Sequence, residues 1–223
     1  MGKGIFNGYT GIIVLINVVA FIVYLILQAI FGPIYIDHLL AIQPFMILQG
    51  KYLWTFVTSM FLHVNIGHLF ANMISLIFVG GFIEKLIGKK RFLYVYFIGG
   101  FVASLFFVFL ANFFGTSVLG ERFFGNPMLL AMGASGAIFA LMGLLAVLIP
   151  RMKVLVFFII PLPMWAAMVG LTFVLWIFSA SFSLPIGNTA HLGGLFVGVV
   201  YGVYLKIKYP RKTKMISQYF GGN

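Results

Sequence analysis

The 223-residue sequence has no cysteine and only three acidic residues. Without cysteine, the chain forms no disulfide, no catalytic thiolate and no metal site with cysteine ligands. Charged residues make up 8% of the chain, whereas a soluble domain carries about 25% because its surface faces water. Apolar residues make up 63%, and the mean hydropathy is +1.15. Most of the surface is therefore expected to contact the lipid bilayer.

The shortage of acid leaves a formal net charge of +11, a value that nucleic-acid binding proteins also reach. Here the Lys and Arg residues form short clusters between apolar runs and near the C-terminus. The 27 Phe residues lie within the apolar runs, so no basic face alternates with aromatic rings that stack on bases. The pattern argues against nucleic acid as a partner and is typical of a membrane protein whose basic residues set its orientation.

Six apolar stretches approach the roughly 20 residues that a helix needs to cross the hydrocarbon core. Their approximate ranges are 11–31, 64–83, 92–114, 133–149, 164–180 and 190–207. The segment 154–160 is also apolar, but Pro161 and Pro163 should interrupt a helix there. We therefore predict an all-α membrane protein, a bundle of six transmembrane helices in a single domain, residues 1–223.

The basic residues also predict the orientation of the helices. With the N-terminus in the cytoplasm, only Lys51 and Arg122 of the 14 Lys and Arg residues lie outside. This asymmetry predicts a multi-pass protein of the cell membrane with cytoplasmic N- and C-termini. The first outer loop, about 32–62, has only Asp37 and Lys51 as formally charged residues, so it should lie partly in the membrane interface.

The fourth helix is expected to be short and recessed. It begins near Gly133 and ends at Pro150, which gives roughly 24 Å, too little to cross the core. Its outer end should therefore lie below the membrane surface, where irregular backbone is tolerated if it lines a cavity. The preceding loop, about 115–132, contains Gly115, Gly120, Gly125 and Pro127, which favour turns over a helix.

Polar residues lie at the outer ends of helices two, four and six, where a polar side chain suggests a functional site. Gly133-Ala134-Ser135-Gly136 places a hydroxyl at a helix start between glycines, although such motifs also serve close helix packing. His191 opens the sixth helix. The glycines that follow it at every fourth residue form a smooth face for a neighbouring helix or for a dimer, so the oligomeric state stays open; they are Gly194, Gly198 and Gly202.

His68 and Asn72 are four residues apart and share one face of the second helix. Both can donate hydrogen bonds, as a site for a developing oxyanion requires, although a polar contact between helices would use them equally well. His63 is about 140° away from His68 around a helix and is expected at the edge of the loop.

Other protease chemistries fit the sequence poorly. The His-Glu-x-x-His pattern of zinc proteases is missing, and a pair of catalytic aspartates is excluded because Asp37 is the only Asp. The remaining acids, Glu84 and Glu121, lie on the inner side and in a loop, so neither suits a Ser-His-Asp triad. If the protein is a hydrolase, a Ser-His dyad remains, and no metal or cofactor is expected.

These residues resemble the rhomboid family of intramembrane serine proteases from about Trp54 to Gly202. The matching elements are His63-x4-His68-x3-Asn72, Gly133-Ala-Ser135-Gly136 and Ala190-His191-Leu-Gly-Gly194-x3-Gly198. Glu84-x-x-x-Gly88 also looks like a turn of that family. Each motif alone is a weak signal, but their order and shared depth make the combination specific.

The resemblance implies a role for each matching residue. Ser135 would be the nucleophile, and His191 the general base and then the acid. The Ser135 backbone N–H, His68 and Asn72 would stabilise the oxyanion. Gly194 and Gly198 would hold helix six against helix four, and Phe139 would pack on the catalytic imidazole.

The implied activity is cleavage of transmembrane protein substrates near their outer end, through an acyl-enzyme. Helix five and the uncharged loop 181–189 would form a movable gate. Two alternatives remain at this point: a catalytically silent relative that binds membrane clients, and a small transporter in which His68, Asn72 and His191 line a pathway.

Overall fold

The computed structural model describes residues 8–156, 159–182 and 187–221. Five helical segments in these ranges are long and apolar enough to cross a membrane: α1 (Tyr9–Phe31), the α5–α6 segment (Ile66–Ile87), α7 (Lys89–Phe114), α10 (Met164–Phe182) and α11 (Asn188–Lys208). A sixth apolar helix, α9 (Ser135–Leu148), is shorter. Each predicted stretch overlaps one of these six, which confirms the six-helix membrane fold.

The second segment is not a uniform helix. It consists of α5 (Ile66–Ser75), a π-helical stretch (Leu76–Gly80) and α6 (Gly81–Ile87). It therefore continues beyond the range 64–83 that hydropathy indicates, because Glu84 and Lys85 are charged yet still helical.

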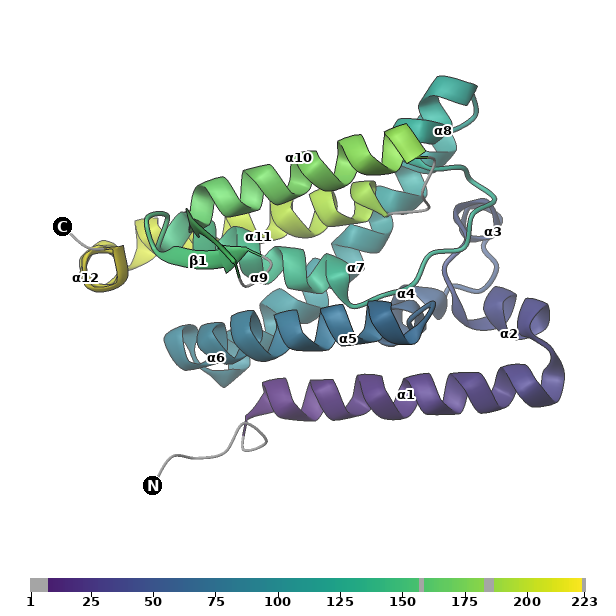
Figure 1. Ribbon diagram of the computed structural model, residues 1–223, viewed down its shortest axis with the longest axis horizontal. Helices are drawn as coiled ribbons and strands as arrows, with labels where there is room; N and C mark the ends of the chain where they lie inside the picture. The colour runs from purple at the N-terminus through teal and green to yellow at the C-terminus, as the bar shows by residue number, and fades with distance from the viewer. Residues whose placement is uncertain (1–7, 157–158, 183–186, 222–223) are drawn as a thin grey trace.

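The short helix α9 lies inside the bundle, between α5 and α10 in Figure 1. Eleven of its 14 residues are buried, and Leu141 and Leu144 have no exposed surface. Its length of about 21 Å at 1.5 Å per residue is less than the hydrocarbon core requires. The fourth helix is thus short, as expected, and its apolar sequence on all sides reflects burial by neighbouring helices.

Small residues bring the central helices close together. A side chain at Gly194 of α11 would overlap the carbonyl oxygen of Gly136, and one at Gly198 would overlap that of Ala140. At Gly202 an added Cβ would lie 2.8 Å from the Val147 Cβ. The glycine face of α11 therefore meets α9, and at its first two glycines it lies against the α9 backbone.

The two ends of the bundle differ in structure and in charge (Figure 1). At the end where α1 begins lie α6, the antiparallel hairpin of β1 (Lys153–Val156) and β2 (Ile160–Pro163), and α12 (Pro210–Gly221). At the opposite end, where α9 begins, lie α2 (Pro33–Leu40), α3 (Pro44–Leu48), α4 (Thr55–Thr58) with the 3₁₀ turn Ser59–Phe61, and α8 (Val118–Phe124). We call this second end the Ser135 end. Of the described Lys and Arg residues, only Lys51, between α3 and α4, and Arg122, on α8, lie there.

Two loops show how well the Pro and Gly residues predicted the local structure. The prediction that prolines prevent a helix at 154–160 is confirmed, because residues 153–156 and 160–163 pair as strands. The prediction that 115–132 favours turns over a helix is wrong for α8. The Ser117 hydroxyl accepts a hydrogen bond from the Gly120 N–H and caps the start of α8, and Gly125, at φ +86°, ends it. Gly115 and Gly125 thus flank this helix, and Gly120 lies within it without breaking it.

A buried carboxylate joins α6 to the start of α1. Glu84 accepts hydrogen bonds from the backbone N–H groups of Tyr9 and Thr10, both at 2.8 Å, and from the Thr10 hydroxyl at 2.7 Å. The first N–H groups of a helix have no partner within it, so this carboxylate stabilises α1 at its N-terminus. Gly88, at φ +86°, then turns the chain into α7.

Candidate active site

The α5 helix begins with a side-chain cap that positions His68. The Asn65 carboxamide oxygen accepts a hydrogen bond from the His68 N–H at 2.8 Å, which places His68 in the first helical turn. Asn72 follows one turn later, and its Nδ2 donates to the His68 carbonyl at 2.9 Å. The second N–H of Asn72 is left for another acceptor. The two side chains lie on one helix face, as their spacing predicts.

His63 lies in the loop before α5, the position expected from its spacing. It is fully buried, and its ring packs edge-on against the His68 ring at 5.1 Å between centroids. Burial, together with the nearby His68, lowers the pKa of His63 to about 3. The ring is therefore neutral at physiological pH and supports His68 by contact.

The chain that leads into α9 is held from both sides. Ile42 and Ala131 exchange two backbone hydrogen bonds at 3.0 and 2.9 Å, and the Gly133 N–H donates to the Ser59 carbonyl at 2.8 Å. Gly133 has φ +141°, and a Cβ there would lie 2.8 Å from Cε1 of His68. A glycine is required because the backbone passes directly beside the imidazole. Ser135 then follows as the first residue of α9.

His191 meets Ser135 at this end of the bundle. It lies in the first turn of α11 and is buried, and its Nε2 is 2.9 Å from Ser135 Oγ, within hydrogen-bonding distance. The Phe139 ring stacks on the imidazole with 4.2 Å between centroids and 7° between planes. Gly136 lies against Ala103 of α7, where a larger residue would push α9 outward. The two residues are thus brought together by the close α9–α11 packing.

One cavity of about 560 Å³ connects these groups. Ser135, His191, His68 and Asn72 all line it, together with Gly133, Gly136 and Phe139. Leu171 and Leu175 of α10 form part of its wall opposite α5. Gly194, Gly198 and His63 do not line the cavity; they lie behind it and position the residues that do.

Among the described residues, no carboxylate lines this cavity. Asp37 accepts hydrogen bonds from Tyr24 and Gln28, and Glu84 is bound to the start of α1. Glu121 lies on α8 and lines a different cavity. Within the described ranges, no group of three or more His, Asp or Glu residues is placed to hold a metal ion. The arrangement can therefore supply a hydroxyl, an imidazole beside it and hydrogen-bond donors nearby.

Sequence reasoning missed the residues that support the site. Asn65 carries a local signal, because an Asn directly before an apolar run is a typical helix cap. Ser59, Ile42 and Ala131 carry none, since their backbone pairings join distant segments that no spacing rule relates. Of the predicted gate loop 181–189, residues 183–186 lie outside the described residues.

Comparison with known proteins finds rhomboid proteins. The family model of the rhomboid domain matches residues 50–208. "Rhomboid protein 1, mitochondrial" of Saccharomyces cerevisiae is 31% identical over 170 residues, which cover 74% of this chain and 46% of that protein. "RHOMBOID-like protein 1" of Arabidopsis thaliana is 32% identical over 169 residues, 75% of this chain and 38% of that protein.

The name of a third relative describes it as inactive. "Inactive RHOMBOID-like protein 8" of Arabidopsis thaliana is 33% identical over 90 residues, 40% of this chain and 26% of that protein. The chain spans less than half the length of these three relatives. Because the family model matches well over half of this multi-pass membrane protein, the chain belongs to the rhomboid family.

Proposed function

We propose that the protein is an intramembrane serine endopeptidase that cleaves transmembrane segments of other proteins with a Ser135–His191 dyad. The observation that carries this proposal is the 2.9 Å contact between Ser135 Oγ and His191 Nε2 inside a cavity lined by further hydrogen-bond donors. A serine hydroxyl is a weak nucleophile until an adjacent base takes its proton, and neutral imidazole is such a base.

The proposed reaction has two steps. Ser135 Oγ attacks the substrate carbonyl carbon while its proton passes to His191 Nε2, and the imidazolium then protonates the leaving amine. Water then attacks the acyl-enzyme; His191 takes its proton and returns one to Ser135. In both steps the carbonyl oxygen becomes an anion, which the Ser135 N–H, His68 and Asn72 would stabilise. No carboxylate is needed if burial and the Phe139 ring hold the imidazole in place.

The substrate is proposed to enter between α5 and α10, the two helices that face each other across the cavity. We place the Ser135 end on the outer side of the membrane and both termini in the cytoplasm, because basic residues concentrate at the opposite end. A transmembrane segment would then be cut near its outer end, where its helix can unwind into the cavity.

The decisive test is labelling and cleavage with matched serine variants. Wild-type protein should react with a fluorophosphonate probe and cleave a transmembrane reporter, and Ser135→Ala should lose both, by at least about 10³-fold in cleavage rate. Ser75→Ala is the matched control, because Ser75 lines the same cavity and, among the described residues, forms a hydrogen bond only with the Ala71 carbonyl. Equal cleavage by wild type and Ser135→Ala in lipid would overturn the proposal.

A catalytically silent, client-binding protein is the second candidate, and the similarity to an inactive relative favours it. In that case the wild-type protein and the Ser135→Ala variant would bind transmembrane segments equally well. The same experiment separates the two: wild type that captures the reporter without cleaving it and without reacting with the probe is a binding protein.

A further inference from the structure

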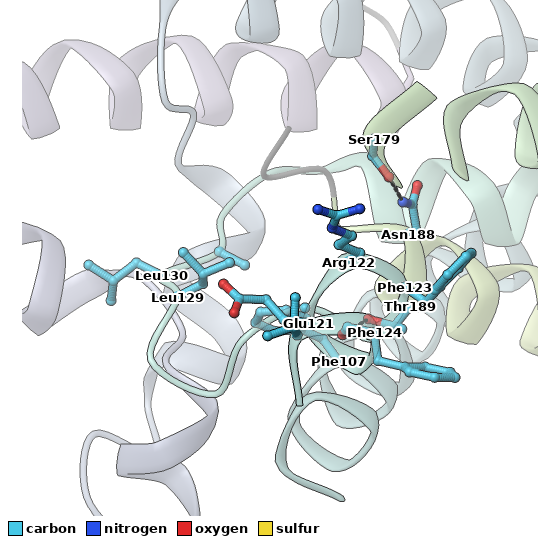
Figure 2. Close-up of a pocket in the computed structure, with 14 residues that line it drawn as sticks. Phe107, Glu121, Arg122, Phe123, Phe124, Leu129, Leu130, Ser179, Asn188 and Thr189 are labelled. Carbon is cyan, nitrogen blue, oxygen red and sulfur yellow. Dashed lines mark hydrogen bonds between the residues drawn. The ribbon is translucent and has the colours of Figure 1, made fainter. Parts of the chain in front are cut away.

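A second cavity of about 490 Å³ adjoins the first at the Ser135 end (Figure 2). Four residues line both cavities: Phe107, Leu130, Ala131 and Gly187. Two of them, Leu130 and Ala131, belong to the segment that leads into Ser135. The two cavities are therefore adjacent, and a peptide bound at the dyad can extend directly into the second one.

The far wall of this cavity is built from polar groups. Ser179 at the end of α10 and Asn188 and Thr189 at the start of α11 are all buried. The Asn188 Nδ2 donates a hydrogen bond to the Ser179 hydroxyl, which closes that side of the cavity (Figure 2). The Asn188 carboxamide oxygen accepts no hydrogen bond from any other residue that the structure describes.

The floor is α8, which presents two adjacent charges. Glu121 and Arg122 both line the cavity, and neither side chain forms a hydrogen bond or an ion pair within the described residues. Figure 2 shows the Glu121 carboxylate toward Leu129 and Leu130 and the Arg122 guanidinium toward Asn188. The cavity thus has a negative group on the side of Leu130 and a positive group on the side of Asn188.

Glu121 is unusual in a chain with three acidic residues. Asp37 is satisfied by Tyr24 and Gln28, and Glu84 is bound at the opposite end of the bundle. Among the described residues, this leaves Glu121 as the one carboxylate without a hydrogen-bond partner. A carboxylate facing a cavity attracts a cation that enters it.

We propose that the second cavity binds the extramembrane segment of the substrate, next to the scissile bond, and that Glu121 selects a basic side chain in that segment. The inference rests on the proposed endopeptidase function and adds to it a determinant of specificity. Asn188 would accept a hydrogen bond from the same segment. Because Glu121 is exposed, its contribution is modest: about two- to fivefold in kcat/KM, the range of a solvent-exposed ion pair.

The test is a charge scan of a transmembrane reporter. Each of about six extramembrane positions next to the cleavage site is changed in turn to Lys, Gln or Glu, and kcat/KM is measured in lipid. Wild type should prefer Lys over Gln at one or two positions. Glu121→Gln should lose that preference, and Glu121→Lys should turn it toward Glu. Arg122→Gln is the matched control and should keep the Lys preference, because the guanidinium lies on the other side of the cavity.

A binding measurement separates this inference from the proposed function. Fluorescent versions of the same reporters are titrated against Ser135→Ala and against Ser135→Ala with Glu121→Gln. If wild type cleaves nothing but Ser135→Ala still prefers the Lys reporter through Glu121, the endopeptidase proposal fails and the binding cavity stands. If wild type cleaves the reporters with no charge preference, or keeps its Lys preference in Glu121→Gln, the cavity has no such role.

Discussion

The α9–α11 pair and the α10 helix differ sharply in how they are packed. Eleven of 14 residues in α9 are buried, against three of 19 in α10. Gly194 and Gly198 hold α11 against the α9 backbone, whereas a Cβ added at Gly170 of α10 would meet no other atom within 4 Å. The pair that carries Ser135 and His191 is therefore tightly packed, and we call it the firm part of the bundle. The α10 helix is packed against few neighbouring residues, and we call it the loose part.

The difference teaches how a site can be both rigid and accessible. A Ser–His hydrogen bond requires two helices held within a fraction of an ångström, which close backbone contact provides. Under the proposed function, a transmembrane substrate requires that some wall of the cavity move, and the wall with the fewest packing contacts would move at the lowest free-energy cost. Four experiments test this division, beginning with the largest expected effect.

Joining α10 to α5 should abolish cleavage of transmembrane substrates. Ala71→Cys and Leu175→Cys place thiols on the two helices that line the cavity, in a chain with no other cysteine. A reducible cross-linker between them should block entry, and reduction should restore the rate, whereas cleavage of a short soluble peptide should persist. Undiminished cleavage of the transmembrane reporter by the cross-linked protein would contradict a moving α10.

Adding one methyl group should separate the firm part from the loose part. Gly198→Ala pushes a Cβ into the Ala140 carbonyl, which is backbone that cannot rotate away, and should lower the free energy of unfolding by up to about 3 kcal/mol. Gly170→Ala is the matched control and should change it by less than about 1 kcal/mol, because its surroundings are open. Unfolding in detergent measures both; equal losses would contradict the comparison.

The pH dependence of stability should test whether the firm part includes the loop before α5. His63 is held neutral, with its pKa lowered to about 3, while an unfolded His titrates near 6.5. The unfolded chain therefore binds more protons between these values, so stability is full above pH 6.5 and falls as the pH drops toward 3. His63 should account for a loss of about 2 kcal/mol between pH 7 and pH 5.

The control for that measurement is His63→Asn, which does not titrate. It should be less stable at pH 7 and show a smaller loss on acidification. The same slope in wild type and His63→Asn would mean that His63 is already accessible to protons in the folded protein.

The smallest effect is expected at the attachment of α10 to α8. Trp176 Nε1 donates to the Phe123 carbonyl at 2.9 Å. Trp176→Phe removes this bond and should cost about 1 kcal/mol locally, with faster hydrogen exchange confined to the end of α10 near Ser179. Trp165→Phe, at the other end of α10, should leave that exchange unchanged. Faster exchange in α9 as well would show that the two parts are not independent.

The sequence predicts much of this fold because lipid imposes a simple rule on it. Apolar runs must be about as long as the bilayer is thick, so six helices are visible from hydropathy alone. Prediction is weaker where polar loops fold outside that constraint. Gly120 and Gly125 indicate turns, yet Gly120 lies within α8 and Gly125 ends it, because the residues that break one helix can cap another.

The site was likewise only partly predictable. Ser135, His191, His68 and Asn72 stand out because polar groups in apolar helices are costly, and the orientation of the helices puts them at one depth. Residues such as Ser59 and Ile42 do not stand out, since they act through backbone atoms that every residue has. The second cavity could not be predicted from the sequence for a related reason. Glu121 lines a cavity only because α8 packs beside α11, which is distant in the sequence.

By itself, the sequence determined which six apolar helices form, their order and the end of the bundle at which the polar residues gather. The physical reason is local, because the cost of burying charge in hydrocarbon depends on each residue and its near neighbours. Only the tertiary structure decided that His191 Nε2 lies 2.9 Å from Ser135 Oγ. That distance depends on where two helices touch, although their site residues are 56 positions apart, and the contact is set by the glycines between α11 and α9.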